Sequence, residues 1–207
     1  YAVSLSGGVD SMVLTSILHF LGKKVVCIHI NYNNRTETIK EEEFIKLWCN
    51  SLNIKIIIHN IDNMRRGEIK RSDYENMTKD IRFNLYKEVL EKYGCSEILL
   101  GHHKDDIIEN IFNNISRGRN ILDLAVLKTI SMIKNINVAR PLLNVHKDVI
   151  FDYAHICDIP YFKDTTPDWS LRGTFRRQIL PLLTSTYSNI SNNLLNISQQ
   201  SNEWNSL

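Results

Sequence analysis

Six residues near the start of the chain combine two glycines, two hydroxyls and a carboxylate in the run Ser6-Gly7-Gly8-Val9-Asp10-Ser11. They follow an apolar segment, residues 1–5, and precede a helical pattern that begins at Met12, which predicts a turn from strand to helix. Glycine permits positive φ and close approach of the backbone, and the first N–H groups of a helix attract anions. The serines can donate to phosphate oxygens, and Asp10 can hold Mg²⁺. We interpret residues 6–11 as a pyrophosphate-binding loop, in preference to an ordinary glycine turn.

This loop differs from two other phosphate-binding signatures. The Gly-Lys-Ser/Thr of a Walker A loop does not follow it, and the dinucleotide pattern Gly-x-Gly-x-x-Gly is absent. The segment therefore predicts a nucleotide site of another kind.

A second cluster of chemically active residues follows the strand expected at residues 97–100, and it contains His102, His103, Lys104, Asp105, Asp106 and Glu109. Ligands gather at the carboxyl ends of parallel strands, so we expect this cluster to open onto the same crevice as residues 6–11. Asp106 and Glu109 are three apart at a helix start and should share one face. Helix capping is the alternative for one acid. Adjacent histidines lack zinc-ligand spacing, which favours Mg²⁺ bound with a nucleotide.

Strand-like and helix-like patterns alternate along the chain, which predicts an α/β fold with a parallel sheet and flanking helices. The expected strands are residues 1–5, 24–30, 54–59 and 97–100, with a hairpin at 130–139. The expected helices are residues 12–21, 41–52, 74–93, 106–116 with further helical segments to about 127, 146–157, 172–184 kinked at Pro181, and one within the last twenty residues. We expect a catalytic domain over residues 1–145 and a helical C-terminal extension over 146–207.

Composition narrows the class of protein without choosing a function. The net charge of +2 is nearly balanced, so any nucleic-acid surface must come from local clusters of arginine and lysine. The four cysteines form no Cys-x-x-Cys pair, and we expect free thiols. No signal peptide or long apolar run is visible, so we expect a cytoplasmic protein that does not enter a membrane.

Taken together, these motifs resemble the PP-loop ATP pyrophosphatases, and within them the tRNA(Ile)-lysidine synthase family. The residues that carry the resemblance are the loop at 6–11, His102-His103-Lys104-Asp105-Asp106 with Glu109, Arg117-Gly118, Arg140-Pro141-Leu142-Leu143, His29-Ile30-Asn31 with Arg35, Glu75 with Arg82-Phe83, and Arg172 with Arg176 before Leu180-Pro181-Leu182-Leu183. The resemblance reaches to about Leu183. It implies the adenine nucleotide alpha hydrolase fold, which is Rossmann-like.

The resemblance also implies a two-step reaction. A cytidine in a tRNA anticodon attacks the α-phosphate of ATP and releases pyrophosphate, and the amine of free L-lysine then displaces AMP. By this resemblance, residues 6–11 and His29 bind ATP, Asp10 binds Mg²⁺, and Asp106 and Glu109 bind lysine. Asp10, Asp106 and Glu109 take part in catalysis together with His102 and His103. The residues implied to contact an isoleucine-type tRNA are Arg35, Arg82, Arg117, Arg140, Arg172 and Arg176. The general base is not assigned, and a homodimer is left open.

Three departures from the family pattern keep other functions in view. Tyr32 replaces a histidine, Ile107 a glutamine and Gly173 an asparagine. The nearest alternative enzyme is a tRNA 2-thiolation enzyme of the PP-loop type, although those usually carry Cys-x-x-Cys pairs. The other alternative is a non-catalytic nucleotide- or RNA-binding relic of the same fold. The retention of Asp10, Asp106 and Glu109 favours the enzyme.

Overall fold

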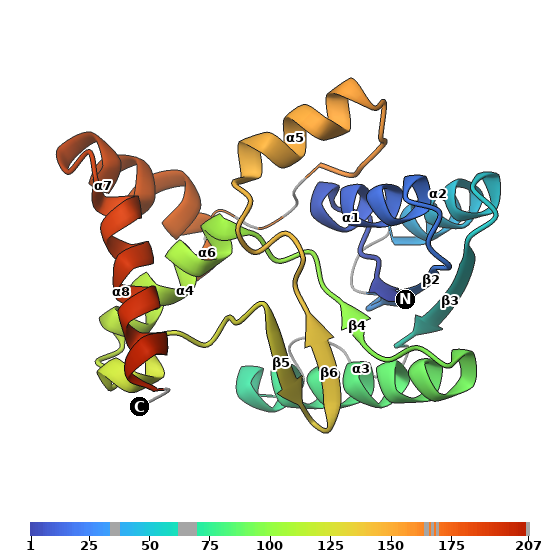
Figure 1. The fold of residues 1–207 in the computed structure, drawn as a ribbon, viewed down its shortest axis with the longest axis horizontal. Coiled ribbons are helices and arrows are strands. Elements are labelled where there is room, and N and C mark those ends of the chain that lie inside the picture. Colours follow the sequence, from blue (N-terminus) through green and yellow to red (C-terminus); the bar gives the residue numbers. More distant parts are fainter. Residues whose placement is uncertain (34–37, 62–69, 164–165, 167, 169, 206–207) are drawn as a thin grey trace. The chain divides into compact units, whose positions relative to one another are not determined.

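The computed structural model describes residues 1–33, 38–61, 70–163, 166, 168 and 170–205. Within these ranges one six-stranded sheet has the order β3-β2-β1-β4-β6-β5 (Figure 1). Its strands are Ala2–Ser4 (β1), Val26–Asn31 (β2), Lys55–Asn60 (β3), Ile98–Leu99 (β4), Ile130–Ile133 (β5) and Ile136–Ala139 (β6). Neighbouring strands are parallel except the β5–β6 hairpin. The predicted α/β class and the hairpin at 130–139 are confirmed.

The helices follow the strands in the alternating order that the sequence predicts. Their bounds are Val9–Phe20 (α1), Thr38–Ser51 (α2), Arg71–Tyr93 (α3), Lys104–Ser116 (α4), Lys147–Ile156 (α5), Leu171–Thr174 (α6), Leu180–Thr186 (α7) and Ile190–Trp204 (α8), with a 3₁₀ helix at Ile121–Asp123 (η1) and a π-helix at Phe175–Ile179 (η2).

One local prediction is wrong. The helical segments expected up to about residue 127 reduce to η1, because the Asn120 side chain accepts from the N–H of Leu122 and holds a tight turn. The helix expected at residues 172–184 is present as the continuous succession of α6, η2 and α7. Pro181 is the second residue of α7, and the kink expected there stays a prediction.

The strand order places the reversal of the sheet between β1 and β4. From β1 the chain moves outward through β2 to β3, whereas β4 pairs with the other side of β1. In sheets of this kind, ligands bind beyond the carboxyl ends of the two strands at such a reversal. The loop at residues 6–11 follows β1, and Gly101 follows β4, so both lie at that place.

The chain divides into two compact units, and each combines several segments. The first contains residues 1–101, 130–141 and 150–162, and the second contains residues 102–129, 142–149 and 163–207. The division into domains at residue 145 stays a prediction.

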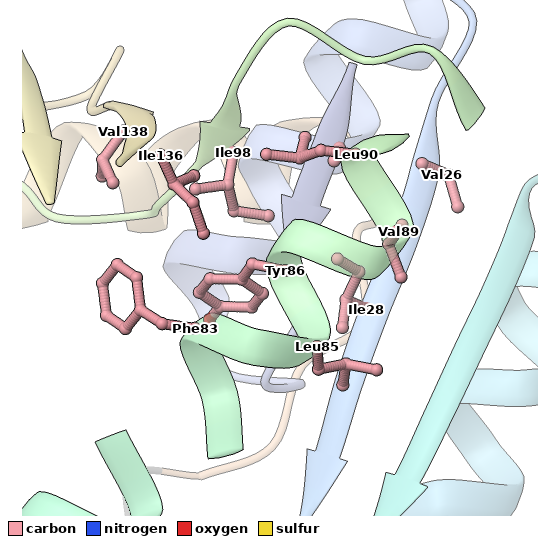
Figure 2. Packing of buried hydrophobic residues seen from close by; sticks show 11 residues of the cluster. Val26, Ile28, Phe83, Leu85, Tyr86, Val89, Leu90, Ile98, Ile136 and Val138 are labelled. Atoms are coloured by element: carbon pink, nitrogen blue, oxygen red, sulfur yellow. The ribbon is translucent and has the colours of Figure 1, made fainter. Parts of the chain in front are cut away.

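The first unit has its own apolar core between the sheet and α3. Figure 2 shows Phe83, Tyr86 and Val89 of α3 directed at residues of β2, β4 and β6, and Tyr86 is 1% exposed. On the opposite face, α1 and α2 cover the sheet (Figure 1). The buried runs predict this arrangement, because a parallel sheet is covered on both faces. Burial of each large side chain stabilises the fold by about 1.5–3 kcal/mol.

The second unit is helical and has a separate core. Ile108 and Ile111 of α4 pack with Phe175 of η2 and Leu194 of α8, and α8 docks through this contact. In the described part of the chain, no helix is both long and apolar enough to cross a membrane.

Candidate active site

The loop at residues 6–11 is held by its own serines. Ser11 Oγ donates to the carbonyl oxygen of Gly8 at 3.0 Å and accepts from the N–H of Ser6 at 3.1 Å. The Gly8 N–H lies 3.3 Å from Ser6 Oγ. Gly8 is the N-cap of α1, and no side chain caps that helix start. The loop therefore presents the first N–H groups of α1 in a form that suits an anion.

Gly7 is required by packing. Its φ is +84°, and a Cβ there would lie 2.5 Å from Phe162 Cδ2. Phe162 also donates its backbone N–H to the carbonyl oxygen of Gly7 at 2.9 Å. A single parallel bridge pairs Phe162 with Gly8. From the sequence, Gly7 is predicted only to let an anion approach the backbone. The sequence gives no sign that Gly7 also packs against Phe162.

Gly101 brings the end of β4 against the start of α1. A Cβ at Gly101 would lie 3.1 Å from Cβ and the carbonyl carbon of Asp10 and from the backbone nitrogen of Ser11. These contacts are tighter than an ordinary Cβ makes, so a side chain at position 101 would require the start of α1 to shift by a few tenths of an ångström. His102, the first residue of the second cluster named in the sequence, follows Gly101 by one peptide bond. A common crevice for Asp10 and Asp106 stays a prediction.

His29 lies at the end of β2 and is 6% exposed. Its Nδ1 is 2.8 Å from the carbonyl oxygen of Leu5, and because a carbonyl only accepts, Nδ1 carries the proton. Burial lowers the pKa of His29. The ring is therefore neutral at pH 7, and Nε2 is left as an acceptor.

In the second unit, two acids of α4 meet two arginines from the α6–η2 segment. Arg172 Nη2 and Arg176 Nη2 lie 2.5 and 2.7 Å from Asp106 Oδ1. The Nε atoms of the same arginines lie 3.2 and 2.7 Å from Glu109 Oε2. We call these four side chains the arginine–carboxylate cluster. Asp106 and Glu109 are three residues apart on α4, and Arg172 and Arg176 are four residues apart on the α6–η2 segment. These spacings place the two acids on one helix face and the two arginines on another.

Asp106 is the most buried member of this cluster, at 6% exposed. Burial by itself raises the pKa of Asp106, but the His103 ring and then Arg172 outweigh it, so the pKa lies below its ordinary value. Its Oδ2 also accepts the N–H of His103 at 3.0 Å, which caps α4. Asp106 is therefore a charged carboxylate that is both a helix cap and the partner of two arginines.

Asp105 ties α4 to the start of α5. Its Oδ2 accepts the N–H of Lys147, the first residue of α5, at 2.7 Å, and its Oδ1 lies 3.4 Å from His146 Nδ1. Burial raises the pKa of Asp105, but the hydrogen bonds with His103, Lys147 and His146 outweigh it and hold the pKa well below the ordinary range. The sequence shows Asp105 as one acid in a cluster and gives no sign of this contact with residues 146 and 147.

His103 lies between the two aspartates. It is 2% exposed, with Nδ1 at 3.3 Å from Asp105 Oδ2 and Nε2 at 3.4 Å from Asp106 Oδ2. A ring so enclosed holds its neighbours in place more readily than it reaches a substrate. His102 is half-buried. A catalytic role for either histidine stays a prediction.

The other arginines expected to contact tRNA differ in exposure. Arg140 is 3% exposed, and its Nη1 donates to Ser131 Oγ at 2.9 Å, which does not favour contact with a phosphate. Arg117 is exposed at the C-cap of α4. Arg82 is half-buried and interacts with the Tyr32 hydroxyl. Burial raises the pKa of Tyr32, and the positive charge of Arg82 offsets part of that rise. Arg35 lies outside the described residues.

Comparison with known proteins places these features in a family. A model described as a PP-loop domain matches residues 1–183. The chain belongs to the PP-loop domain family. The match supports ATP use by this domain, and the assignment of residues 6–11 as its PP-loop stays a prediction.

Relatives of this PP-loop chain include tRNA(Ile)-lysidine synthases. That of Bacteroides thetaiotaomicron is 28% identical over 204 residues, covering 97% of this chain and 47% of the relative. That of Francisella philomiragia is 32% identical over 194 residues, covering 93% of this chain and 48% of the relative. The chain thus spans about half the length of these relatives. The resemblance predicted from the motifs is confirmed.

A solved structure confirms the predicted fold. The U34-tRNA thiolase NcsA of Methanococcus maripaludis has a TM-score of 0.76 and 18% identity, covering 99% of this chain and 71% of that chain. At this identity the likeness extends to the fold of the PP-loop domain and no further.

The residues of the PP-loop are compatible with Mg²⁺ bound together with a nucleotide. Among the described residues, no group of three or more histidine, cysteine, aspartate or glutamate side chains lies together as a metal site. Asp10, half-buried in the first turn of α1, supplies one carboxylate. Mg²⁺ commonly takes one or two carboxylates and completes its shell with phosphate oxygens and water, so a single acid fits.

Proposed function

We propose that this chain is the catalytic part of an ATP-dependent tRNA-modifying ligase that forms lysidine. In the first step, a cytidine of a tRNA anticodon attacks the α-phosphate of ATP and releases pyrophosphate. In the second step, the ε-amine of free L-lysine attacks the adenylated base and releases AMP. The observation that carries the proposal is the PP-loop together with the arginine–carboxylate cluster in a chain similar to tRNA(Ile)-lysidine synthases over nearly its whole length.

ATP binding is assigned to the loop and its surroundings. The start of α1, uncapped by side chains, would receive the pyrophosphate portion, with Ser6 and Ser11 as neighbouring hydroxyl donors. Asp10 would hold Mg²⁺, which when bound offsets charge that builds on the phosphates. His29, neutral through burial, would offer Nε2 as an acceptor near the end of β2.

Lysine and tRNA binding are assigned to the second unit. Asp106 and Glu109 would receive the lysine ammonium by charge-assisted contacts. Arg172 and Arg176, 49% and 26% exposed at their side chains, would contact tRNA phosphates. Transfer of the amine proton to Asp106, Glu109, His102 or His103 would make lysine nucleophilic. An isoleucine-type tRNA and a homodimer remain part of this proposal.

The experiment that tests the proposal is incubation of the protein with ATP, labelled lysine and total tRNA. Stable label on RNA, with release of AMP and pyrophosphate in equal amounts, is the expected result. Incorporation of sulfur from a persulfide donor in place of lysine would assign the chain to tRNA thiolation, and binding without pyrophosphate release would make it a non-catalytic relic.

The matched control is Asp10→Asn, which removes the proposed metal ligand and changes no apolar packing. We expect pyrophosphate release to fall by at least a hundredfold while circular dichroism and the unfolding midpoint stay as in the parent. Equal turnover in variant and parent would count against the assignment of Asp10.

A further inference from the structure

The four side chains of the arginine–carboxylate cluster neutralise one another. Two arginines and two acids make four contacts of 2.5–3.2 Å, and all four reach just two oxygens, Asp106 Oδ1 and Glu109 Oε2. Two positive and two negative charges sum to zero. In this arrangement the acids have no excess charge with which to attract a further cation.

Burial within the cluster is unequal. The side chains of Asp106 and Glu109 are 6% and 14% exposed, whereas those of Arg172 and Arg176 are 49% and 26% exposed. An anion from solvent therefore reaches the guanidinium groups first. A cation from solvent reaches the shared carboxylate oxygens only after a guanidinium group has moved aside.

From this geometry we infer that the binding of tRNA and of lysine is thermodynamically linked through the arginine–carboxylate cluster. The inference rests on the proposed function, which assigns phosphates to the arginines and the lysine ammonium to the acids. Those two assignments compete in the free protein, because each pair is the counter-ion of the other. When tRNA phosphates draw Arg172 and Arg176 outward, Asp106 and Glu109 lose their arginine partners and gain affinity for the ammonium.

The linkage has a chemical consequence for the order of events. Lysine binds its acids more tightly when an RNA is in place, so the amine is favoured at the site when an adenylated base can be present. The long arginine side chains can make this change by rotamer exchange, which needs no movement of the backbone.

Linkage of this kind is reciprocal, and this gives a test that needs no variant. The dissociation constant of lysine is measured by equilibrium dialysis of the parent protein with and without saturating tRNA. The dissociation constant of tRNA is measured in the same way with and without saturating lysine. We expect tRNA to tighten lysine binding by about tenfold and lysine to tighten tRNA binding by the same factor. Equal lysine affinity in the two conditions would overturn the linkage. Absence of lysine binding even with tRNA and ATP would overturn the proposed function instead.

Substitution of Arg172 tests whether the cluster carries the linkage. In Arg172→Gln we expect lysine to bind the tRNA-free protein more tightly than it binds the parent, and the linkage factor to fall toward one. The control is Arg177→Gln, because Arg177 pairs with Asp168 and not with the cluster. An unchanged factor in Arg172→Gln, or an equal fall in Arg177→Gln, would reject this assignment.

Discussion

At the residue scale, Gly7 and Gly8 are neighbours under different constraints. Gly7 has φ +84° and packs on Phe162, whereas Gly8 has φ −72°, and a Cβ there would meet only Ser6 Oγ, at 3.5 Å. We expect Gly7→Ala to lower the free energy of unfolding by about 2–4 kcal/mol, from the left-handed backbone and the clash. Gly8→Ala should change it by less than about 1 kcal/mol and weaken ATP binding. Urea denaturation and ATP titration measure both, and similar stability losses in the two variants would contradict this account.

His29 gives a prediction about pH at the same scale. Its pKa in the folded protein lies below the ordinary value of 6.5, so the unfolded chain binds the proton more readily. The contribution of His29 is therefore fully present above pH 6.5 and is lost as pH falls from there toward the lowered pKa. We expect His29→Gln to flatten the fall in unfolding free energy between pH 7.5 and 5.5, by less than about 1.4 kcal/mol per pH unit. His155→Gln, at an exposed histidine, is the control substitution measured over the same pH range.

Much of the chemistry at this scale is predictable from sequence, but the partners are not. Glycines, serines and Asp10 identify the PP-loop because they are contiguous. The pairing of Glu109 with Arg176 joins residues 67 apart. The only sign of this cluster in the local sequence is spacing. Asp106 and Glu109 are three residues apart, and Arg172 and Arg176 are four apart, so each pair lies on one helical face. Nothing in the sequence indicates that these two faces meet.

At the scale of elements, Asp105 links α4 with α5 by accepting the first N–H of α5. We expect Asp105→Ala to lower the free energy of unfolding by about 1–2 kcal/mol, because that N–H and His146 lose an acceptor. The control is Asp148→Ala, at an exposed acid in the first turn of α5, which should lower the free energy of unfolding by less. Thermal unfolding at pH 7 measures the difference, and equal losses would refute the link.

The same contact depends on pH, because the pKa of Asp105 is lowered in the folded protein. The stabilisation by Asp105 is present above the pKa that Asp105 has in the unfolded chain, and it is lost as pH falls through the pKa of the folded protein.

The element pattern is predicted well where burial alone decides it. Continuous apolar runs give β1, β2 and β4, and a run of apolar residues at helical spacing gives α1. The π-helix η2 is not predicted, and its first residue, Phe175, packs on Phe112 of α4 with the ring centroids 5.0 Å apart. Tertiary contact of this kind overrides the local preference of the chain.

At the scale of the whole molecule, neither compact unit is a continuous stretch of chain. Residues 150–162 belong to the unit that contains the sheet, and they include Phe162, which covers Gly7. A fragment of residues 1–145 lacks these residues and α8. We expect that fragment to show no cooperative unfolding transition, whereas a fragment of residues 1–205 should show one as sharp as the parent. A folded fragment 1–145, detected by dispersed amide resonances, would instead support an independent domain there.

The bridge from Phe162 to Gly7 and Gly8 also bears on synthesis at the ribosome. The turn at residues 6–11 leaves the exit tunnel well before the ring that packs against it, because Phe162 is far downstream in the chain. Until that aromatic side chain emerges, the nascent turn lacks one of its walls. Nucleotide capture by the growing polypeptide should therefore appear late and abruptly during translation.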